Sequence, residues 1–246
     1  MSIQNKVVLI TGAASGIGRA AAIHFAQKGA QLVIADVDTA GLAQTLTETS
    51  PNEAQVQTQV CDVSNSSEVR ALVQQAHAHW GRIDVLIHAA GICRAVPLLE
   101  MTDEEWWATL RVNLDGSFFI TRECGNIMAA QKSGTMILMT SDRGIYGSAN
   151  YAQYAASKGG MIALVKSLAL HMGQFNVTVN GLNPGMTDTP LSRGANPTSY
   201  DSKLLADVLG KATTSEEAAH TLLYLATEAS YYTTGQIIGT RLRHGQ

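Results

Sequence analysis

Seven short apolar segments recur along the chain with helical patterns between them, and this rhythm constrains the fold more than any other feature. Residues 7–10 and 85–87 are apolar at every position and do not alternate with polar residues. Such uninterrupted strands are buried on both faces, as in a parallel sheet covered by helices. The seven segments are residues 6–11, 31–36, 55–61, 83–88, 135–141, 177–182 and 236–239. We therefore predict an α/β fold: a doubly wound parallel sheet of about seven strands with helices on both faces.

Chain length and helix signals favour one domain. The 246 residues suit one sheet with its helices, since α/β units of ~250 residues around a single sheet are common. Two helix starts have the spacing of a capping box, Thr102 with Glu105 and Thr214 with Glu217. No linker or repeat divides the pattern. We expect residues 1–246 to form one Rossmann-type domain, in which the long connection at about 188–211 is a lid over the substrate.

Composition excludes several kinds of partner. Lys and Arg number 17 against 20 Asp and Glu, a formal net charge of -3 without any block of like charge. This balance does not suit binding to nucleic acid or to a membrane surface. Cys61, Cys93 and Cys124 are too few and too widely spaced for a disulfide framework or a metal site, so no metal is expected. With no signal segment or membrane span in view, we expect a cytoplasmic protein that acts on a small molecule.

A glycine-rich segment, Thr-Gly-Ala-Ala-Ser-Gly-Ile-Gly at residues 11–18, follows the first expected strand. Its glycines let the backbone turn tightly and begin a helix whose N–H groups attract an anion. A strand before it and a helix after it are the setting that a dinucleotide loop requires. The residues expected to contact the cofactor here are Gly12, Ser15, Gly16, Ile17 and Gly18.

Asp36 ends the second expected strand, about twenty residues after the glycine-rich segment. A carboxylate at this position can accept hydrogen bonds from both ribose hydroxyls of an adenosine, whereas a 2′-phosphate would meet a like charge. Val37 follows it, and Ser15 within the loop is not basic, so nothing in the sequence neutralises such a phosphate. We predict NAD in preference to NADP.

Tyr154 and Lys158 are four residues apart on one face of an expected helix. An ammonium beside a phenol lowers its pKa from ~10, which suits a general acid/base that acts on an alcohol or a ketone. Ser141 ends an earlier expected strand, at the sheet edge where open α/β sheets bind ligands. Its hydroxyl, or that of Thr140 in its place, can polarise a substrate carbonyl.

Taken together, the motifs resemble the short-chain dehydrogenase/reductase family in order and spacing, from residue 6 to about 240. The chain is similar to its compact ~250-residue NAD(P)-dependent members, including the 3-oxoacyl reductases. The motifs are residues 11–18, Asp62-Val63, Ala89-Ala90-Gly91, Asn113, Ser141, Tyr154 with Lys158, and Asn183-Pro184-Gly185.

The resemblance implies a role for each matching residue. Tyr154 would exchange a proton with the substrate oxygen, Ser141 would orient that oxygen, and Lys158 would bind the nicotinamide ribose and lower the pKa of the tyrosine. Asn113 would hold a water that links Lys158 to solvent. A homotetramer or homodimer is also implied. Further cofactor contacts would come from Asp62, Val63, Ala90, Gly91, Pro184, Gly185, Thr187 and Thr189.

The chain departs from the family pattern at two places. His88 stands where the family usually has Asn, so support of the neighbouring backbone must come from its imidazole, or the segment must rearrange. Residues 239–246 replace the Asp-Gly-Gly that commonly follows the seventh strand. Packing at the C-terminus is therefore expected to differ.

These features predict an NAD-dependent oxidoreductase that interconverts a secondary alcohol and a ketone by hydride transfer. Three alternatives stay open: a reductase of 3-oxoacyl groups on acyl carrier protein or CoA, a catalytically silent NAD-binding sensor or scaffold, and a non-redox reaction such as dehydration. Arg94, Arg143 and Arg193 fall on segments expected around the pocket, which suggests an anionic substrate. Loop arginines are more often simply solvated.

Overall fold

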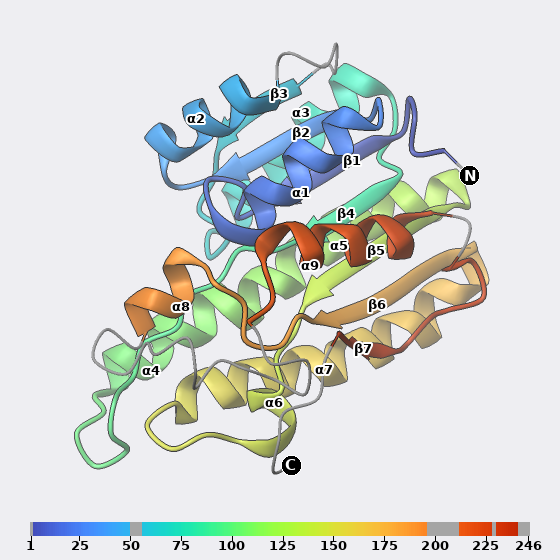
Figure 1. The fold of residues 1–246 in the computed structure, drawn as a ribbon. Coiled ribbons are helices and arrows are strands. Elements are labelled where there is room, and N and C mark those ends of the chain that lie inside the picture. The colour runs from blue at the N-terminus through green and yellow to red at the C-terminus, as the bar shows by residue number, and fades with distance from the viewer. Residues whose placement is uncertain (1, 50–55, 196–211, 228–229, 241–246) are drawn as a thin grey trace.

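A parallel sheet of seven strands in the order β3-β2-β1-β4-β5-β6-β7 forms the centre of the protein (Figure 1). The computed structural model describes residues 2–49, 56–195, 212–227 and 230–240. Each strand coincides with a predicted apolar segment, which confirms the predicted fold class. The strands are β1 (Val7–Thr11), β2 (Gln31–Asp36), β3 (Val56–Val60), β4 (Val85–His88), β5 (Gly134–Met139), β6 (Val177–Asn183) and β7 (Ile237–Gly239).

Two helical layers cover the sheet (Figure 1). One layer contains α1 (Gly16–Gln27), α2 (Thr39–Thr49) and α9 (Ser215–Ala226). The other contains α3 (Ser66–Trp80), α5 (Gly116–Gln131) and α7 (Ala152–Met172). Shorter helical segments are α4 (Asp103–Leu110), the π-helical turn η2 (Arg111–Asp115), α6 (Arg143–Tyr146), η3 (Gly173–Phe175) and α8 (Pro190–Ala195). No helix in these described ranges is long and apolar enough to cross a membrane.

Burial on both faces explains the uninterrupted apolar strands. In β1, Val8 and Ile10 pack into the core beneath α1 and α9, whereas Leu9 packs into the core beneath α3, α5 and α7. Because side chains alternate between the faces, each layer requires its own set of apolar residues. Both predicted capping boxes form, at Thr102 before α4 and at Thr214 before α9.

The strand order reverses direction between β1 and β4, and this switch point positions the ligand cleft. From β1 the chain builds outward to β2 and β3, and then crosses back to β4 and continues the other way. The connections that leave β1 and β4 therefore diverge, which opens a crevice at the carboxyl edge of the sheet.

His88 joins the two strands at the switch point. It stands opposite Thr11 in the β1–β4 register, and its Nδ1 lies 2.7 Å from the Thr11 hydroxyl oxygen. The imidazole thus contacts the hydroxyl of Thr11, and among the described residues it makes no hydrogen bond to the neighbouring backbone, which was the support expected of it. Complete burial, together with the charge of Lys158, lowers the pKa of His88 to about 3, so the ring is neutral. Within the described residues its Nε2 has no hydrogen-bond partner.

Replacement of His88 by Asn should make stability less dependent on pH. A histidine with a native pKa far below its unfolded value of 6.5 takes up a proton only on unfolding, so acidification below about pH 6.5 favours the unfolded state. Between pH 7 and pH 5 the free energy of unfolding should fall by about 2 kcal/mol more in the wild type than in His88→Asn. Urea unfolding at both pH values measures the difference. The exposed His79→Asn variant should retain the wild-type slope, and an unchanged slope in His88→Asn would contradict the assignment.

Candidate active site

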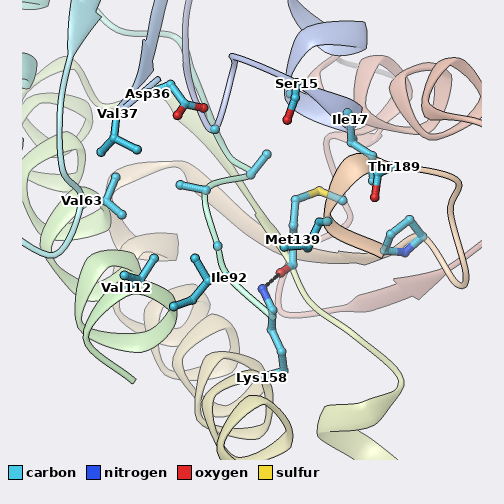
Figure 2. A pocket seen from close by; sticks show the side chains of 18 of the residues that line it. Ser15, Ile17, Asp36, Val37, Val63, Ile92, Val112, Met139, Lys158 and Thr189 are labelled. Carbon is cyan, nitrogen blue, oxygen red and sulfur yellow. Dashed lines mark hydrogen bonds between the residues drawn. The ribbon is translucent and has the colours of Figure 1, made fainter. Parts of the chain in front are cut away.

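A cleft of about 450 Å³ opens at the carboxyl edge of the sheet, where the connections after the six strands β1 to β6 meet. Figure 2 shows Asp36 and Val37 on one side of it, Ser15 and Thr189 on another, and Lys158 reaching in from α7. Every predicted cofactor residue lines this cleft except Gly185 and Thr187, which line a smaller cavity beside it. Lining residues that sequence reasoning did not single out are Cys61, Ile92, Val112, Met139 and Leu191.

The glycine-rich loop lies tightly against its neighbours because it has no side chains at the contact points. A Cβ on Gly18 would overlap the carbonyl oxygen of Gly12, and Gly12 itself has a φ of +72°. A Cβ on Gly12 would lie 2.5 Å from the backbone nitrogen of Ala90. The Ser15 hydroxyl makes no capping bond to α1, and the first turn of this helix contains no acidic residue. The amino end of α1 thus presents its positive dipole to the cleft.

Asp36 is held at the far end of the cleft by backbone N–H groups. Its Oδ2 accepts from Ala14 N–H at 3.0 Å and its Oδ1 accepts from Asp38 N–H at 3.1 Å. The guanidinium of Arg19 is engaged by groups other than the Asp36 carboxylate. It donates to the Ala14 carbonyl and to Thr45 Oγ1, and it lies 3.9 Å from Glu48. The carboxylate therefore faces the cleft without a basic lining residue beside it.

Tyr154 and Lys158 lie together on the buried face of α7. Lys158 Nζ donates a 2.6 Å hydrogen bond to the Met139 carbonyl at the end of β5 (Figure 2). The same nitrogen lies 5.6 Å from the centroid of the Tyr154 ring. Burial lowers the pKa of Lys158 to about 8. Burial also raises the pKa of Tyr154. A hydrogen bond with Ser141 and the charge of Arg143 offset only part of this rise. The expected lowering of the tyrosine pKa by Lys158 is thus wrong for the protein alone, because desolvation of the phenol dominates.

Ser141 lies two residues beyond the end of β5, at the edge of the smaller cavity. Its Oγ accepts from Arg143 N–H at 3.2 Å and donates to Asp142 at 3.2 Å. Thr140, the alternative hydroxyl, is buried and lines both cavities, and its Oγ1 has no hydrogen-bond partner among the described residues. Both hydroxyls therefore border the space next to Tyr154.

Asn113 stands in the π-helical turn that joins α4 to α5, and it does not line the cleft. Its side-chain amide accepts from Ile92 N–H at 2.8 Å and donates to the Ile92 carbonyl at 2.9 Å. The same amide donates to Ser157 Oγ on α7 at 3.1 Å. Asn113 thus fixes the loop after β4 against the helix that carries Tyr154 and Lys158. A Cβ on Gly91 would lie 3.1 Å from its Oδ1, so this loop can approach closely only with glycine.

A cavity of about 110 Å³ adjoins the cleft and shares Tyr154 with it. Of the three candidate arginines only Arg143 lines this cavity. Arg94 is exposed, and Arg193 on α8 forms a two-pronged ion pair with Asp188 at 2.8 and 2.9 Å. The expected lid is described only as far as Ala195, which lines the cavity; residues 196–211 and the atypical tail at 241–246 lie outside the described residues.

Comparison with known proteins places the chain in a family. The family model described as enoyl-(acyl carrier protein) reductase matches residues 12–240. The chain is 36% identical over 239 residues to a 3-oxoacyl-(acyl-carrier-protein) reductase of Thermotoga maritima, with 97% of each chain covered. The chain belongs to the short-chain dehydrogenase/reductase family. This confirms the predicted resemblance, and as a member of the family the protein is an oxidoreductase.

Other members of the short-chain dehydrogenase/reductase family show how widely the fold is used. A (2S)-((R)-hydroxy(phenyl)methyl)succinyl-CoA dehydrogenase subunit of Thauera aromatica is 35% identical, over 97% of this chain and 96% of the relative. The crystal structure of levodione reductase superposes with a TM-score of 0.92 at 30% identity, over 97% of this chain and 96% of that one. Relatives named for such different substrates match along nearly the whole chain, so overall similarity does not identify the substrate.

Replacement of Gly18 by Ala should weaken dinucleotide binding at least 10-fold, because the new methyl group would displace the Gly12 carbonyl and with it the loop. Titration of NADH fluorescence measures the dissociation constant. The matched control is Gly173→Ala at the end of α7, where φ is -56° and no atom lies within 4 Å of the added Cβ. NADH affinity that is equal in both variants would show that the loop does not hold the cofactor.

Proposed function

We propose that the protein is an NAD-dependent oxidoreductase that interconverts a secondary alcohol and a ketone, with Tyr154 as its general acid/base. The observation that carries the proposal is the position of Tyr154. It stands where a cleft suited to a dinucleotide meets a smaller cavity that suits a substrate, with Lys158 on one side and Ser141 on the other.

The cleft fits a nicotinamide dinucleotide at each of its parts. The glycine loop and the amino end of α1 suit the pyrophosphate, and the Asp36 carboxylate suits the adenosine ribose. Asp62 and Val63 flank the adenine position, with Ala90 and Gly91 along the groove. The nicotinamide end would be held by Lys158 and by the segment Pro184, Gly185, Thr187 and Thr189.

The residues at the nicotinamide end of the cleft can accept and donate the proton of the reaction. When bound, the nicotinamide ring supplies hydride transfer at C4 and, in its oxidised form, a positive charge that favours ionisation of Tyr154. In the oxidising direction an alcohol would lose a hydride from carbon and a proton from oxygen, and Tyr154 would accept that proton as the C=O bond forms. Ser141 would hold the substrate oxygen. Reduction reverses both transfers, and the raised pKa of Tyr154 suits it to donate.

A second candidate is reduction of a 3-oxoacyl group carried on acyl carrier protein or CoA. The names of the relatives from Thermotoga maritima and Chlamydia trachomatis support it, since both are 3-oxoacyl-(acyl-carrier-protein) reductases. The chemistry at Tyr154 would be the same, so the two candidates differ only in what occupies the smaller cavity. A silent NAD-binding sensor is disfavoured, because the tyrosine, lysine and serine are all in place.

The assembly and its location are part of the proposal. We infer that the protein is cytoplasmic and that it forms a homotetramer or homodimer. The assembly is supported by large apolar side chains that are exposed on helices of the single chain. Trp107 on α4 and Phe118 on α5 are 50% and 44% exposed, and Leu170 on α7 is 87% exposed. Covering such surface with a second copy removes apolar area from water.

Replacement of Tyr154 by Phe should abolish turnover and leave NADH affinity within about 2-fold of wild type. It removes the only group proposed to exchange the proton but keeps the ring that packs in the site. NADH oxidation with a panel of ketones measures turnover, and fluorescence titration measures affinity. The control is Tyr146→Phe, since this tyrosine on α6 is 61% exposed. Retained turnover in Tyr154→Phe would refute the proposal.

The wild type should use NADH at least about 100-fold more efficiently than NADPH, since a like-charge contact at Asp36 costs several kcal/mol. The double variant Asp36→Ala with Val37→Arg should reverse the preference, because it removes the repulsion and adds a cation at the same edge. The ratio of the two kcat/KM values measures it. Asp36→Asn keeps an acceptor for Ala14 N–H and should relax the preference without reversing it. A wild type that prefers NADPH would contradict this assignment of the cofactor.

A further inference from the structure

Arg143 presents an oriented guanidinium to the smaller cavity. Its Cζ lies 3.7 Å from the centroid of the Tyr151 ring, so the cation stacks on the aromatic face. Tyr151 is itself fixed, because its hydroxyl donates to the Ala195 carbonyl at 3.1 Å. Stacking on a fixed ring restricts the arginine side chain before any ligand arrives, which lowers the entropic cost of binding.

The charge of Arg143 is not matched by a carboxylate in the described part of the chain. Five other described arginines form ion pairs with Asp or Glu: Arg19, Arg70, Arg82, Arg122 and Arg193. Arg94 and Arg111 form none but are exposed to solvent. Arg143 is partly buried, and its one side-chain hydrogen bond to another described residue is from Nη1 to Cys93 Sγ at 3.5 Å, a weak acceptor. A partly desolvated cation with unmatched donors is costly unless a ligand completes it.

We propose that Arg143 binds a carboxylate of the substrate, and that the substrate is a short keto acid or the corresponding hydroxy acid. The inference rests on the proposed function, because it requires that Tyr154 bind the reacting oxygen. A guanidinium matches a carboxylate with two parallel hydrogen bonds. The cavity of about 110 Å³ has room for a carboxylate and a short carbon chain.

The closeness of Arg143 and Tyr154 favours a short substrate. Arg143 Cζ lies 6.0 Å from the centroid of the Tyr154 ring. Because this places the two side chains close together, we consider keto acids with two to four bonds between the carboxylate carbon and the reacting carbon. 3-Oxobutanoate, 4-oxopentanoate and 5-oxohexanoate cover this range.

Asp142 lines the same cavity but contacts Ser141 and not Arg143. It accepts from Ser141 Oγ at 3.2 Å and forms no ion pair with Arg143. Arg143 instead reaches across to Cys93, on the loop after β4. The carboxylate is therefore assigned to the Cys93 side of the cavity, away from the Asp142 charge.

The test compares each of the three keto acids with its methyl ester, in which the charge is removed and the ketone kept. The intact protein is assayed by NADH oxidation, and binding of the same compounds to its NADH complex is measured by calorimetry. The wild type should prefer at least one acid over its ester by 10-fold or more. Arg143→Met, which still packs on Tyr151, should lower the acid-over-ester ratio to about 1.

Two further variants separate a direct contact from a general effect. Arg143→Lys keeps the charge but loses the two-pronged geometry, so it should retain part of the preference. Arg94→Met removes a charge from the exposed loop after β4 and should keep the wild-type ratio. The ratio is the decisive readout, because any effect of Arg143 on the Tyr154 proton acts equally on acid and ester. Thermal unfolding and NADH affinity verify that each variant is folded.

The inference is overturned if no acid is preferred over its ester by the wild type, or if the preference survives in Arg143→Met. Its failure is distinguishable from failure of the proposed function. Turnover of the esters without a preference for acids refutes the carboxylate site alone. Binding of acids that depends on Arg143 but leads to no NADH oxidation supports the site and refutes the oxidoreductase assignment.

Discussion

Because the parallel sheet is buried on both faces, polar groups can lie together only at its carboxyl edge. The rest of the structure depends on this constraint. The strands β1, β4, β5 and β6 are lined by apolar side chains toward both helical layers, so charged groups are excluded from their faces. At the carboxyl edge the chain leaves the sheet, and backbone groups and polar side chains become available together. The glycine loop, Asp36, Ser141 and the Met139 carbonyl all occupy this edge.

The groups at the edge depend on one another because they are buried. Lys158 is only 4% exposed, and it is held by a backbone carbonyl instead of a carboxylate. A neutral acceptor leaves the ammonium charge uncompensated, which is why burial lowers its pKa to about 8. The same uncompensated charge helps to keep His88 neutral. A carboxylate in place of the carbonyl would stabilise the ammonium and so oppose the lowering of the Lys158 pKa.

Much of this arrangement can be predicted from the sequence because it depends on local patterns of residues. The strands follow from apolar runs, the two capping boxes from their spacing, and the cleft from glycines placed between a strand and a helix. What stayed hidden depends on contacts between distant segments. Any residue at position 139 would offer a carbonyl to Lys158, so no side chain signals that bond. The pKa of Tyr154 could not be inferred from its spacing to Lys158, because its direction is decided by burial.

The three candidate arginines also show that contacts between distant segments cannot be predicted from local patterns. Arg94, Arg143 and Arg193 are equally plausible in the sequence, and only folding separates them: one is exposed, one is paired with Asp188, and one faces the cavity. Many residues of the cofactor cleft belong to the motifs that carried the resemblance, such as Gly12, Asp62 and Gly91. The adjoining cavity is lined in part by side chains outside those motifs, such as Cys93 and Arg143. A resemblance therefore predicts the cleft well and the substrate poorly, because the two halves of the site meet only at Tyr154 and a few neighbours.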